Sequence, residues 1–228
     1  MKRIVEPELL DELPQNDPRA IHSRRDLQRL NFLMGNVGII ERALFNHFPN
    51  QTPKRIVELG AGDGNFLLQL ARRLSKRWDD VEVVLVDRQN LVTNETKKKI
   101  KALGWRCEGV SADVFDWLSN CEPADCMLAN LFLHHFDDEK LSELLRGVAD
   151  KTNVFASCEP RRSSPGIFGT RLLWAIGCNE VTRHDAAVSV RAGFCADEIS
   201  KLWPQNSNWK INEHEAGLFS HAFSAGRV

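Results

Sequence analysis

Two hydrophobic periodicities alternate along this chain and predict strands and helices in turn. Short apolar runs that are typical of buried strands cover residues 56–59, 81–86, 105–110, 126–131 and 154–158. Between them, apolar residues recur at helical spacing over residues 66–74, 93–103 and 138–148. Strands that alternate with helices in this way favour right-handed crossovers and a parallel sheet.

The N-terminal part of the chain precedes the first strand and has its own pattern. Residues 1–20 include three prolines among acids and amides, and they predict an irregular lead-in. Apolar residues then keep helical spacing over 23–45, with an interruption at Gly35. This part predicts two amphipathic helices, with Asp26 capping or opening the first, that cover the turn after the first strand.

The C-terminal part predicts an antiparallel end to the sheet. Residues 209–214 and 218–223 alternate apolar with polar side chains around a Glu-Ala-Gly turn, which is typical of a hairpin. The predicted fold class is therefore α/β. We expect a Rossmann-like open sheet that is mostly parallel with an antiparallel closing strand, helices on both faces, and an N-terminal helical cap.

Charge and cysteine content narrow the class of protein. The chain has 30 Lys and Arg against 31 Asp and Glu, so it lacks the basic field that usually accompanies nucleic-acid binding. Its six cysteines include no CxxC pair, which favours a reduced, cytoplasmic protein. The start of the chain lacks the apolar core of a signal peptide, and no run approaches the ~20 apolar residues of a membrane span.

A glycine-rich turn follows the first predicted strand. Gly60, Gly62 and Gly64 stand at alternate positions after the apolar run 56–59, and helical spacing begins at Phe66. Such a turn, between a parallel strand and a helix N-terminus, is where open α/β sheets bind nucleoside-containing ligands. The spacing is GxGxG, with Asn65 where the dinucleotide fingerprint GxGxxG has its third glycine, which disfavours a nicotinamide cofactor.

Polar residues mark the ends of four predicted strands. Glu58 precedes the glycine turn, Asp87 ends the second strand, Asp113 follows the third, and Asn130 lies in the fourth. The carboxyl ends of parallel strands lie at one edge of a sheet, so these side chains are expected to line one crevice.

These segments resemble the motifs of the class I S-adenosylmethionine-dependent methyltransferases of the small-molecule type. The resemblance covers roughly residues 53–160 and rests on four segments in order: VELGAGDG, VVLVD, SADVFD and ADCMLANLFLHHF. It implies S-adenosyl-L-methionine as the cofactor. It also implies a single domain, residues 1–228, in which 1–50 is a helical cap, 53–160 the cofactor-binding core, and 161–228 a substrate-side insertion with the closing hairpin.

The resemblance assigns roles to residues of the crevice. Gly60 and Gly62 would hold the methionine part of the cofactor, Glu58 its amino group, Asp87 the ribose hydroxyls, and Asp113 the adenine. The full expected cofactor-binding set is Glu58, Gly60, Ala61, Gly62, Asp87, Arg88, Ala112, Asp113, Val114, Asn130 and Leu131. The chemistry fits independently, because one carboxylate accepts hydrogen bonds from two adjacent hydroxyls and an acidic crevice suits a cationic cofactor.

Three histidines are the candidate catalytic residues. His134 and His135 follow the fourth strand, where they can orient or deprotonate an acceptor hydroxyl or simply hydrogen-bond within the loop. His184 lies in the insertion and is either a substrate-contacting base or a polar residue at a helix start, with Asp185 as the cap. His134 and His135 with Asp137 and Asp138 can also be interpreted as a metal cluster, but we expect no metal site.

The insertion carries a dense apolar run over residues 167–176, which predicts a buried helix, a wall of an apolar substrate pocket, or both. We expect methyl transfer to a small acceptor, apolar or aromatic, at a phenol, quinol or carboxylate oxygen, in lipid, quinone or secondary metabolism. The alternative is a non-catalytic cofactor-binding sensor or partner protein. Nucleic-acid and protein methylation are disfavoured, because the fourth strand lacks the Pro-Pro-aromatic motif and paired glutamates. A homodimer is possible.

Overall fold

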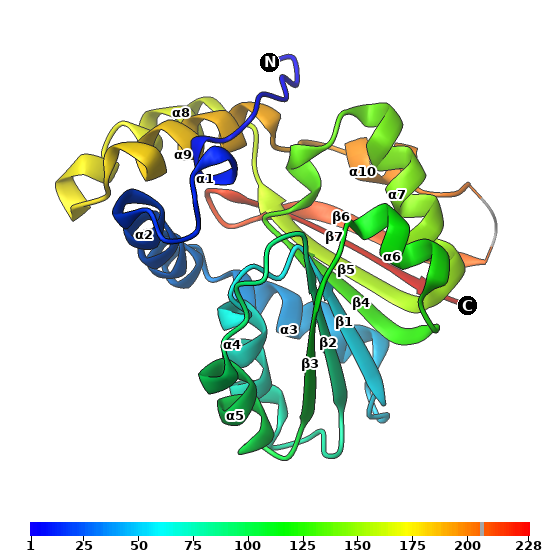
Figure 1. Cartoon of the computed structure of the whole chain (residues 1–228). Coiled ribbons are helices and arrows are strands. Elements are labelled where there is room, and N and C mark those ends of the chain that lie inside the picture. The colour runs from blue at the N-terminus through cyan, green and yellow to red at the C-terminus, as the bar shows by residue number, and fades with distance from the viewer. Residues whose placement is uncertain (206–207) are drawn as a thin grey trace.

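The computed structural model describes residues 1–205 and 208–228 and contains a seven-stranded sheet (Figure 1). The strand order is β3-β2-β1-β4-β5-β7-β6. β1 to β5 are parallel to one another, whereas β7 is antiparallel to both β5 and β6. The strands are β1 Arg55–Leu59, β2 Glu82–Asp87, β3 Arg106–Ser111, β4 Ala124–Asn130, β5 Thr152–Pro160, β6 Trp209–Ala216 and β7 Ser220–Arg227. The predicted fold class is confirmed.

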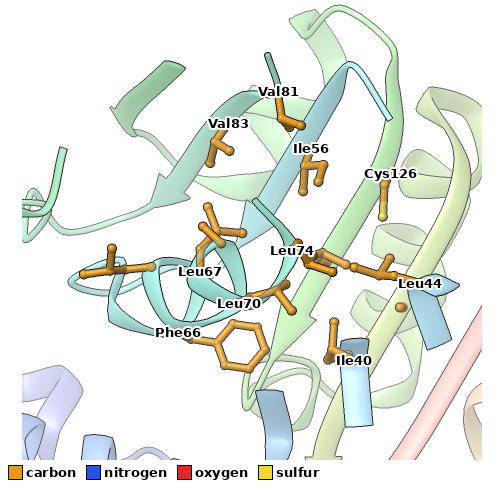
Figure 2. Close-up of a cluster of buried hydrophobic side chains, with 14 of the residues drawn as sticks. Ile40, Leu44, Ile56, Phe66, Leu67, Leu70, Leu74, Val81, Val83 and Cys126 are labelled. Carbon is orange, nitrogen blue, oxygen red and sulfur yellow. The ribbon is translucent and has the colours of Figure 1, made fainter. Parts of the chain in front are cut away.

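Helices cover both faces of the sheet because successive strand residues point to opposite sides. Ile56 packs into a core with α3, α4 and α5, and its neighbour Val57 packs into a second core with α6, α7 and α10. Figure 2 shows the first core, in which Leu67, Leu70 and Leu74 of α4 lie against Ile56 and Val83. These helices are α3 Asn36–His47, α4 Asn65–Leu74, α5 Asn94–Lys101, α6 Val114–Asn120, α7 Asp138–Lys151 and α10 Glu198–Leu202.

The remaining helices gather beyond the carboxyl ends of the parallel strands (Figure 1). They are α1 Leu9–Glu12, α2 Pro18–Met34, α8 Ser164–Thr170 and α9 Glu180–Ala192, with 3-10 turns η1 Leu133–His135 and η2 Leu173–Ile176. Of the described residues, no helix combines the length and apolar character that crossing a membrane requires.

The start of α2 differs from the prediction. Asp17 caps the helix by accepting a hydrogen bond from Arg19 N at 2.8 Å, and Pro18 occupies the first helical position, where its missing N–H costs nothing. Asp26 is therefore neither a cap nor a helix start. It is fully buried within α2 and accepts hydrogen bonds from Asn179 N and Thr182 Oγ1, which begin α9.

The apolar run of the insertion is not a buried helix. It divides into α8 and η2, and the side chains of Phe168, Leu172, Trp174 and Ile176 are exposed. The periodicity did indicate helical turns, and α8 packs against α9 while these four side chains stay in solvent.

Candidate active site

The glycine turn has the backbone conformation that the sequence suggested. Gly60, Gly62 and Gly64 all have positive φ, which glycine adopts without the steric cost that other residues pay. A Cβ at Gly60 would stand 2.2 Å from the ring of Phe132, so the turn also requires glycine for close packing. The turn leads directly into α4, and Asn65 and Phe66 at the start of this helix line the crevice.

Glu58 is a buried carboxyl group beneath this turn. Its Oε2 atom finds no hydrogen-bond partner among the described residues, although the residue is almost fully buried. Burial, followed by the negative charges of Asp63 and Asp87, raises the pKa of Glu58 well above its ordinary value. A buried carboxyl oxygen that has no partner and lines a cavity suits a ligand ammonium group, so this site fits the amino end of S-adenosylmethionine.

Asp87 ends β2 beside the same turn. Its Oδ2 accepts a hydrogen bond from Gly62 N and its Oδ1 accepts one from Gln89 N, both at 2.8 Å. These bonds fix the carboxylate in orientation while each oxygen keeps a further lone pair toward the cavity. The arrangement suits two adjacent hydroxyl donors, as on a ribose.

Residues after β3 form the next part of the wall. Asp113 Oδ1 accepts a hydrogen bond from Phe115 N and caps α6, while Ala112 N donates to Asp87 O at 3.0 Å. Arg88, Ala112, Asp113 and Val114 all line the cavity. The structure thus brings the expected adenine-side residues together with Asp87.

Asn130 and Leu131 close the crevice at the end of β4. Asn130 Oδ1 accepts from Asn36 Nδ2 at 2.9 Å, and Asn130 Nδ2 donates to Asn31 Oδ1 at 3.1 Å. This amide network joins β4 to the α2–α3 junction across Gly35. Leu131 has a φ of 53°, which a leucine rarely adopts, so the chain turns sharply at the cavity wall.

His134 is held between two carboxylates. Its Nδ1 lies 2.8 Å from Glu159 Oε2 of β5, and its Nε2 lies 3.3 Å from Glu8 Oε1 of the N-terminal segment. Burial alone would lower the pKa of His134, but these two hydrogen-bonded carboxylates raise it to about 9. Burial would likewise raise the pKa of Glu8, yet the hydrogen bond from His134 leads the effects that lower it to about 2. His134 is therefore protonated at neutral pH and is unsuited to accept a proton.

His135 has the opposite character. It lines the cavity, and its Nδ1 lies 3.7 Å from Asp11 Oδ2, beyond hydrogen-bonding distance. Burial, together with the positive charge of His134, lowers the pKa of His135. Burial also raises the pKa of Asp11. A neutral imidazole at the cavity wall is a competent proton acceptor.

His184 does not join the other candidates. Its neighbours on α9, Ala186, Ser189 and Val190, line the large cavity, but His184 lines a separate depression of about 280 Å³ with Leu9. Positions 184 and 186 lie about 200° apart around a helix that turns ~100° per residue, which explains the difference. Asp185 is not the helix cap either, since Asn179 caps α9. Asp185 instead accepts hydrogen bonds from the backbone N–H groups of Leu9 and Leu10.

One cavity of about 920 Å³ joins these groups. Pockets that hold a single drug-sized ligand measure about 300–1,000 Å³, so this volume suffices for a nucleoside-containing cofactor and a small acceptor together. The predicted cofactor residues form its polar part. Apolar residues of α2, η2 and α9 form another part, among them Leu27, Leu30, Met34, Leu173 and Val190.

Several residues at the site were not foreseen from the sequence. Glu8 and Asp11 lie in the segment that was predicted to be an irregular lead-in, and they reach the cavity only because α1 packs on α9. Glu159 directly follows the predicted fifth strand, so the rule that flagged Asp87 and Asp113 would have found it. Its Oε1 accepts hydrogen bonds from Phe132 N and Leu133 N and shapes the loop that carries His134.

Glu8, His134 and His135 have ligand atoms within 4.8 Å of one another, which is close enough to hold a metal ion. The ion pairs of a protonated His134 with Glu8 and Glu159 account for the same geometry. Asp137 and Asp138, which the sequence placed in a possible metal cluster, have other roles. Asp137 caps α7, and Asp138 pairs with Arg3 at 2.7 Å.

Comparison with known proteins identifies the central part of the chain. Residues 56–153 match the model of a family described as a methyltransferase domain. These residues run from β1 to the start of β5 and include the glycine turn, Asp87, Asp113 and Asn130. No curated protein sequence matches the chain.

Solved structures show the same fold at low sequence identity. The plantazolicin methyltransferase BpumL in complex with SAH is 15% identical, with a TM-score of 0.67 over 93% of this chain and 92% of that chain. An O-methyltransferase family protein from Burkholderia thailandensis is 18% identical, with a TM-score of 0.64 over 93% and 60%. LaPhzM is 20% identical, with a TM-score of 0.59 over 96% and 60%.

SAH is the product that remains when S-adenosylmethionine has lost its methyl group. The free Oε2 atom of Glu58, the glycine turn and Asp87 fit the same cofactor here. The family match, the shared fold and these residues lead to one conclusion: residues 56–153 carry a methyltransferase domain, within a chain that has the fold of the class I S-adenosylmethionine-dependent methyltransferases.

Proposed function

We propose that this protein methylates an oxygen of a small-molecule acceptor: the hydroxyl of a phenol or a quinol, which needs a base, or a carboxylate, which does not. One observation carries the proposal: His135, whose pKa is lowered by burial, lines the same cavity as the residues that fit the cofactor. A cavity that combines a cofactor site with a neutral imidazole suits an acceptor that arrives with a proton on its nucleophilic atom.

Each residue has a defined task in this proposal. When bound, S-adenosylmethionine supplies a methyl group on a sulfonium sulfur. Glu58 provides the carboxylate for its ammonium group, and Asp87 accepts the hydrogen bonds of its ribose. His135 takes the proton of the acceptor hydroxyl as the oxygen becomes a nucleophile. The cavity walls contribute orientation and the exclusion of water, which suit an in-line displacement.

His134 has a positioning role rather than a role as a base. Its two carboxylate partners hold the loop that carries His135 against the N-terminal segment. The positive charge of His134 also helps to keep His135 unprotonated, because two adjacent imidazolium ions repel each other.

The physiological setting is part of the proposal. The likeness to a plantazolicin methyltransferase and to O-methyltransferase family proteins supports a place in secondary metabolism, with lipid or quinone metabolism as further settings. The six free cysteines support a reducing compartment such as the cytoplasm.

Binding and turnover test the proposal separately. Calorimetric titration should show micromolar binding of S-adenosylmethionine and S-adenosylhomocysteine and no binding of NAD. Asp87→Ala should weaken cofactor binding by about 1–3 kcal/mol, because hydrogen bonds to the ribose are lost. Cofactor binding without turnover, across a screen of phenols, quinols and carboxylic acids, would favour the non-catalytic alternative.

A matched pair of histidine variants tests the assignment of the base. His135→Asn should lower turnover by about 10²–10⁴-fold, the usual contribution of a general base, and leave cofactor affinity nearly unchanged. His184→Asn is the control, because His184 also adjoins an acid but lies outside the cavity. Equal activity of the two variants would remove His135 from the mechanism.

A further inference from the structure

Exposed apolar side chains gather at the outer edge of the cavity. Leu33 of α2, Leu172 and Ile176 of the η2 segment, and Phe219 of the β6–β7 turn line the cavity, yet they remain 67%, 51%, 51% and 40% exposed. We call these four side chains the apolar rim. Other exposed apolar residues lie within four positions of them in the chain, namely Phe32, Phe168, Trp174 and Leu218.

The apolar rim continues the inner wall of the cavity. On α2, Leu27, Leu30 and Met34 line the cavity at helical spacing, and Leu33 carries the same face outward. Opposite, Leu173 lines the interior, while Leu172 and Ile176 lie at the edge. Apolar side chains therefore continue from the interior of the cavity to its edge, while Gln28 and Asn31 of α2 line the same cavity beside them.

Polar contacts behind the rim hold its two sides in place. The buried carboxylate of Asp26 on α2 accepts hydrogen bonds from Asn179 N at 3.0 Å and Thr182 Oγ1 at 3.1 Å, just after η2. Asn179 Nδ2 also donates to Arg19 O at 2.8 Å. In Figure 1, α2 and the segment around α8 lie on the same side of the molecule, beyond the end of the sheet. These bonds tie the walls together at one end of the rim.

A small phenol would fill only the interior and leave this rim in water. Contiguous exposed apolar surface usually marks a binding site, and each methylene group that it buries contributes about 0.8 kcal/mol. Continuity with the cavity identifies the occupant as part of the ligand that the cavity holds. The polar cofactor residues lie on the other walls, so the rim faces the acceptor.

We propose that the acceptor is an elongated amphiphile, an inference that rests on the proposed function. Its hydroxyl end reaches His135, and its apolar body leaves the cavity across the apolar rim. The body is either a flexible alkyl chain or a rigid run of aromatic rings, since both bury apolar surface.

Chain length is the variable that tests this proposal. The probes are 4-alkylphenols from ethyl to octyl, kept below their aggregation concentrations, with 4-phenylphenol and 4-hydroxyterphenyl as the rigid series. Binding is measured by calorimetry with S-adenosylhomocysteine present. We expect about fourfold tighter binding for each methylene group that rests on the rim, from ~0.8 kcal/mol per group at about 1.4 kcal/mol per tenfold. The series whose affinity rises more per added carbon shows whether the apolar part of the acceptor is a flexible chain or a rigid run of rings.

The double variant Leu172→Ser, Ile176→Ser should flatten the length dependence and leave the affinity for ethylphenol and for S-adenosylhomocysteine unchanged. Ile21→Ser is the matched control, because Ile21 is an exposed apolar residue of α2 that does not line the cavity. That variant should bind the whole series as the unmodified protein does.

Three results would overturn the proposal. Affinity independent of length in the unmodified protein would mean that the rim does not contact the acceptor. Sedimentation as a dimer that the rim variant dissociates would mean that a second copy covers the rim. Binding to phosphatidylcholine vesicles that the rim variant abolishes would assign the rim to a bilayer surface. A fourth result, no binding of S-adenosylhomocysteine by the unmodified protein, would contradict the proposed function itself. The first three results contradict only the role of the rim.

Discussion

Glu8 Oε1 lies 3.3 Å from His134 Nε2, so an acid near the start of the chain contacts a histidine that follows β4. Ser189 Oγ donates to the same Glu8 oxygen and adds α9 to the contact. Glu159 holds the other side of the His134 ring at 2.8 Å. The N-terminal segment, the loop after β4, α9 and β5 therefore meet at one buried imidazolium ion beside the cavity.

Glu8→Gln should destabilise the protein by about 1–3 kcal/mol, because it removes one charged partner from buried His134. Urea denaturation at neutral pH measures this loss. Glu6→Gln is the control, since Glu6 forms an exposed pair with Arg191 and should change stability by less than ~1 kcal/mol. Equal effects of the two changes would mean that the Glu8–His134 contact contributes nothing of its own.

The same contact predicts a dependence of stability on pH. The pKa of His134 is raised to about 9 in the folded protein, so its contribution is fully present below about 6.5 and is lost as the pH rises through about 9. The pKa of Glu8 is lowered to about 2, so its contribution is present above about 4.5 and is lost as the pH falls through about 2.

The free energy of unfolding should thus fall between pH 6.5 and 9 by up to about 3 kcal/mol on account of His134. Urea denaturation at pH 6.5, 7.5 and 9 measures the slope. His134→Asn should remove this part of the slope, whereas His184→Asn should keep it. A parallel fall in the His134→Asn variant would assign the slope to other groups.

Cofactor binding should release a proton from Glu58. Its pKa is raised chiefly by burial, so the carboxyl group is protonated over a wider pH range than an exposed one, and an ammonium ligand requires the ionised form. Affinity for S-adenosylmethionine should therefore rise as the pH rises through the pKa of Glu58. Calorimetry in two buffers with different ionisation enthalpies counts the released proton.

Glu58→Gln should weaken cofactor binding and abolish this proton release. The same change should stabilise the ligand-free protein at alkaline pH, because the contribution of a group with a raised pKa is present at low pH and lost as the pH rises. Proton release that persists in the variant would show that another group titrates on binding.

Gly60→Ala tests the close packing of the glycine turn. An added Cβ would stand 2.2 Å from Phe132 and would also impose strain at a φ of 68°, so a loss of about 1–3 kcal/mol in stability is expected, together with weaker cofactor binding. Gly104→Ala is the control, since Gly104 has a φ of 86° but nothing lies within 4 Å of its Cβ position. It should show the backbone strain alone and leave cofactor affinity intact.

Much of the fold was readable from local patterns. Runs such as 82–87 bury side chains on both faces of the sheet, so they are apolar throughout, and helices that cover one face repeat their leucines at helical spacing. Because parallel strands end at one edge, the acids after them could be placed together without knowing the sheet order. This reasoning predicted that Glu58, Asp87 and Asp113 share a crevice, and all three line one cavity.

Local patterns failed to predict a residue's role where that role depends on contacts with distant parts of the chain. Asp26 resembled a helix cap because acids are common at that position, but a buried contact with α9 decides its role. His184 resembled a catalytic base, yet the rotation of α9 turns it away from the cavity. The apolar run at 167–176 resembled a buried helix, but burial is a property of what packs over a segment.

The sequence by itself determined the order of the elements, the glycine turn and the acids that fit the cofactor, because these features follow from backbone geometry and from the burial of neighbouring residues. Only the tertiary structure decided that Glu8 meets His134, that His135 rather than His184 faces the cavity, and that an apolar rim stays exposed. Those outcomes depend on how segments more than 100 residues apart pack together, and no local periodicity records such packing.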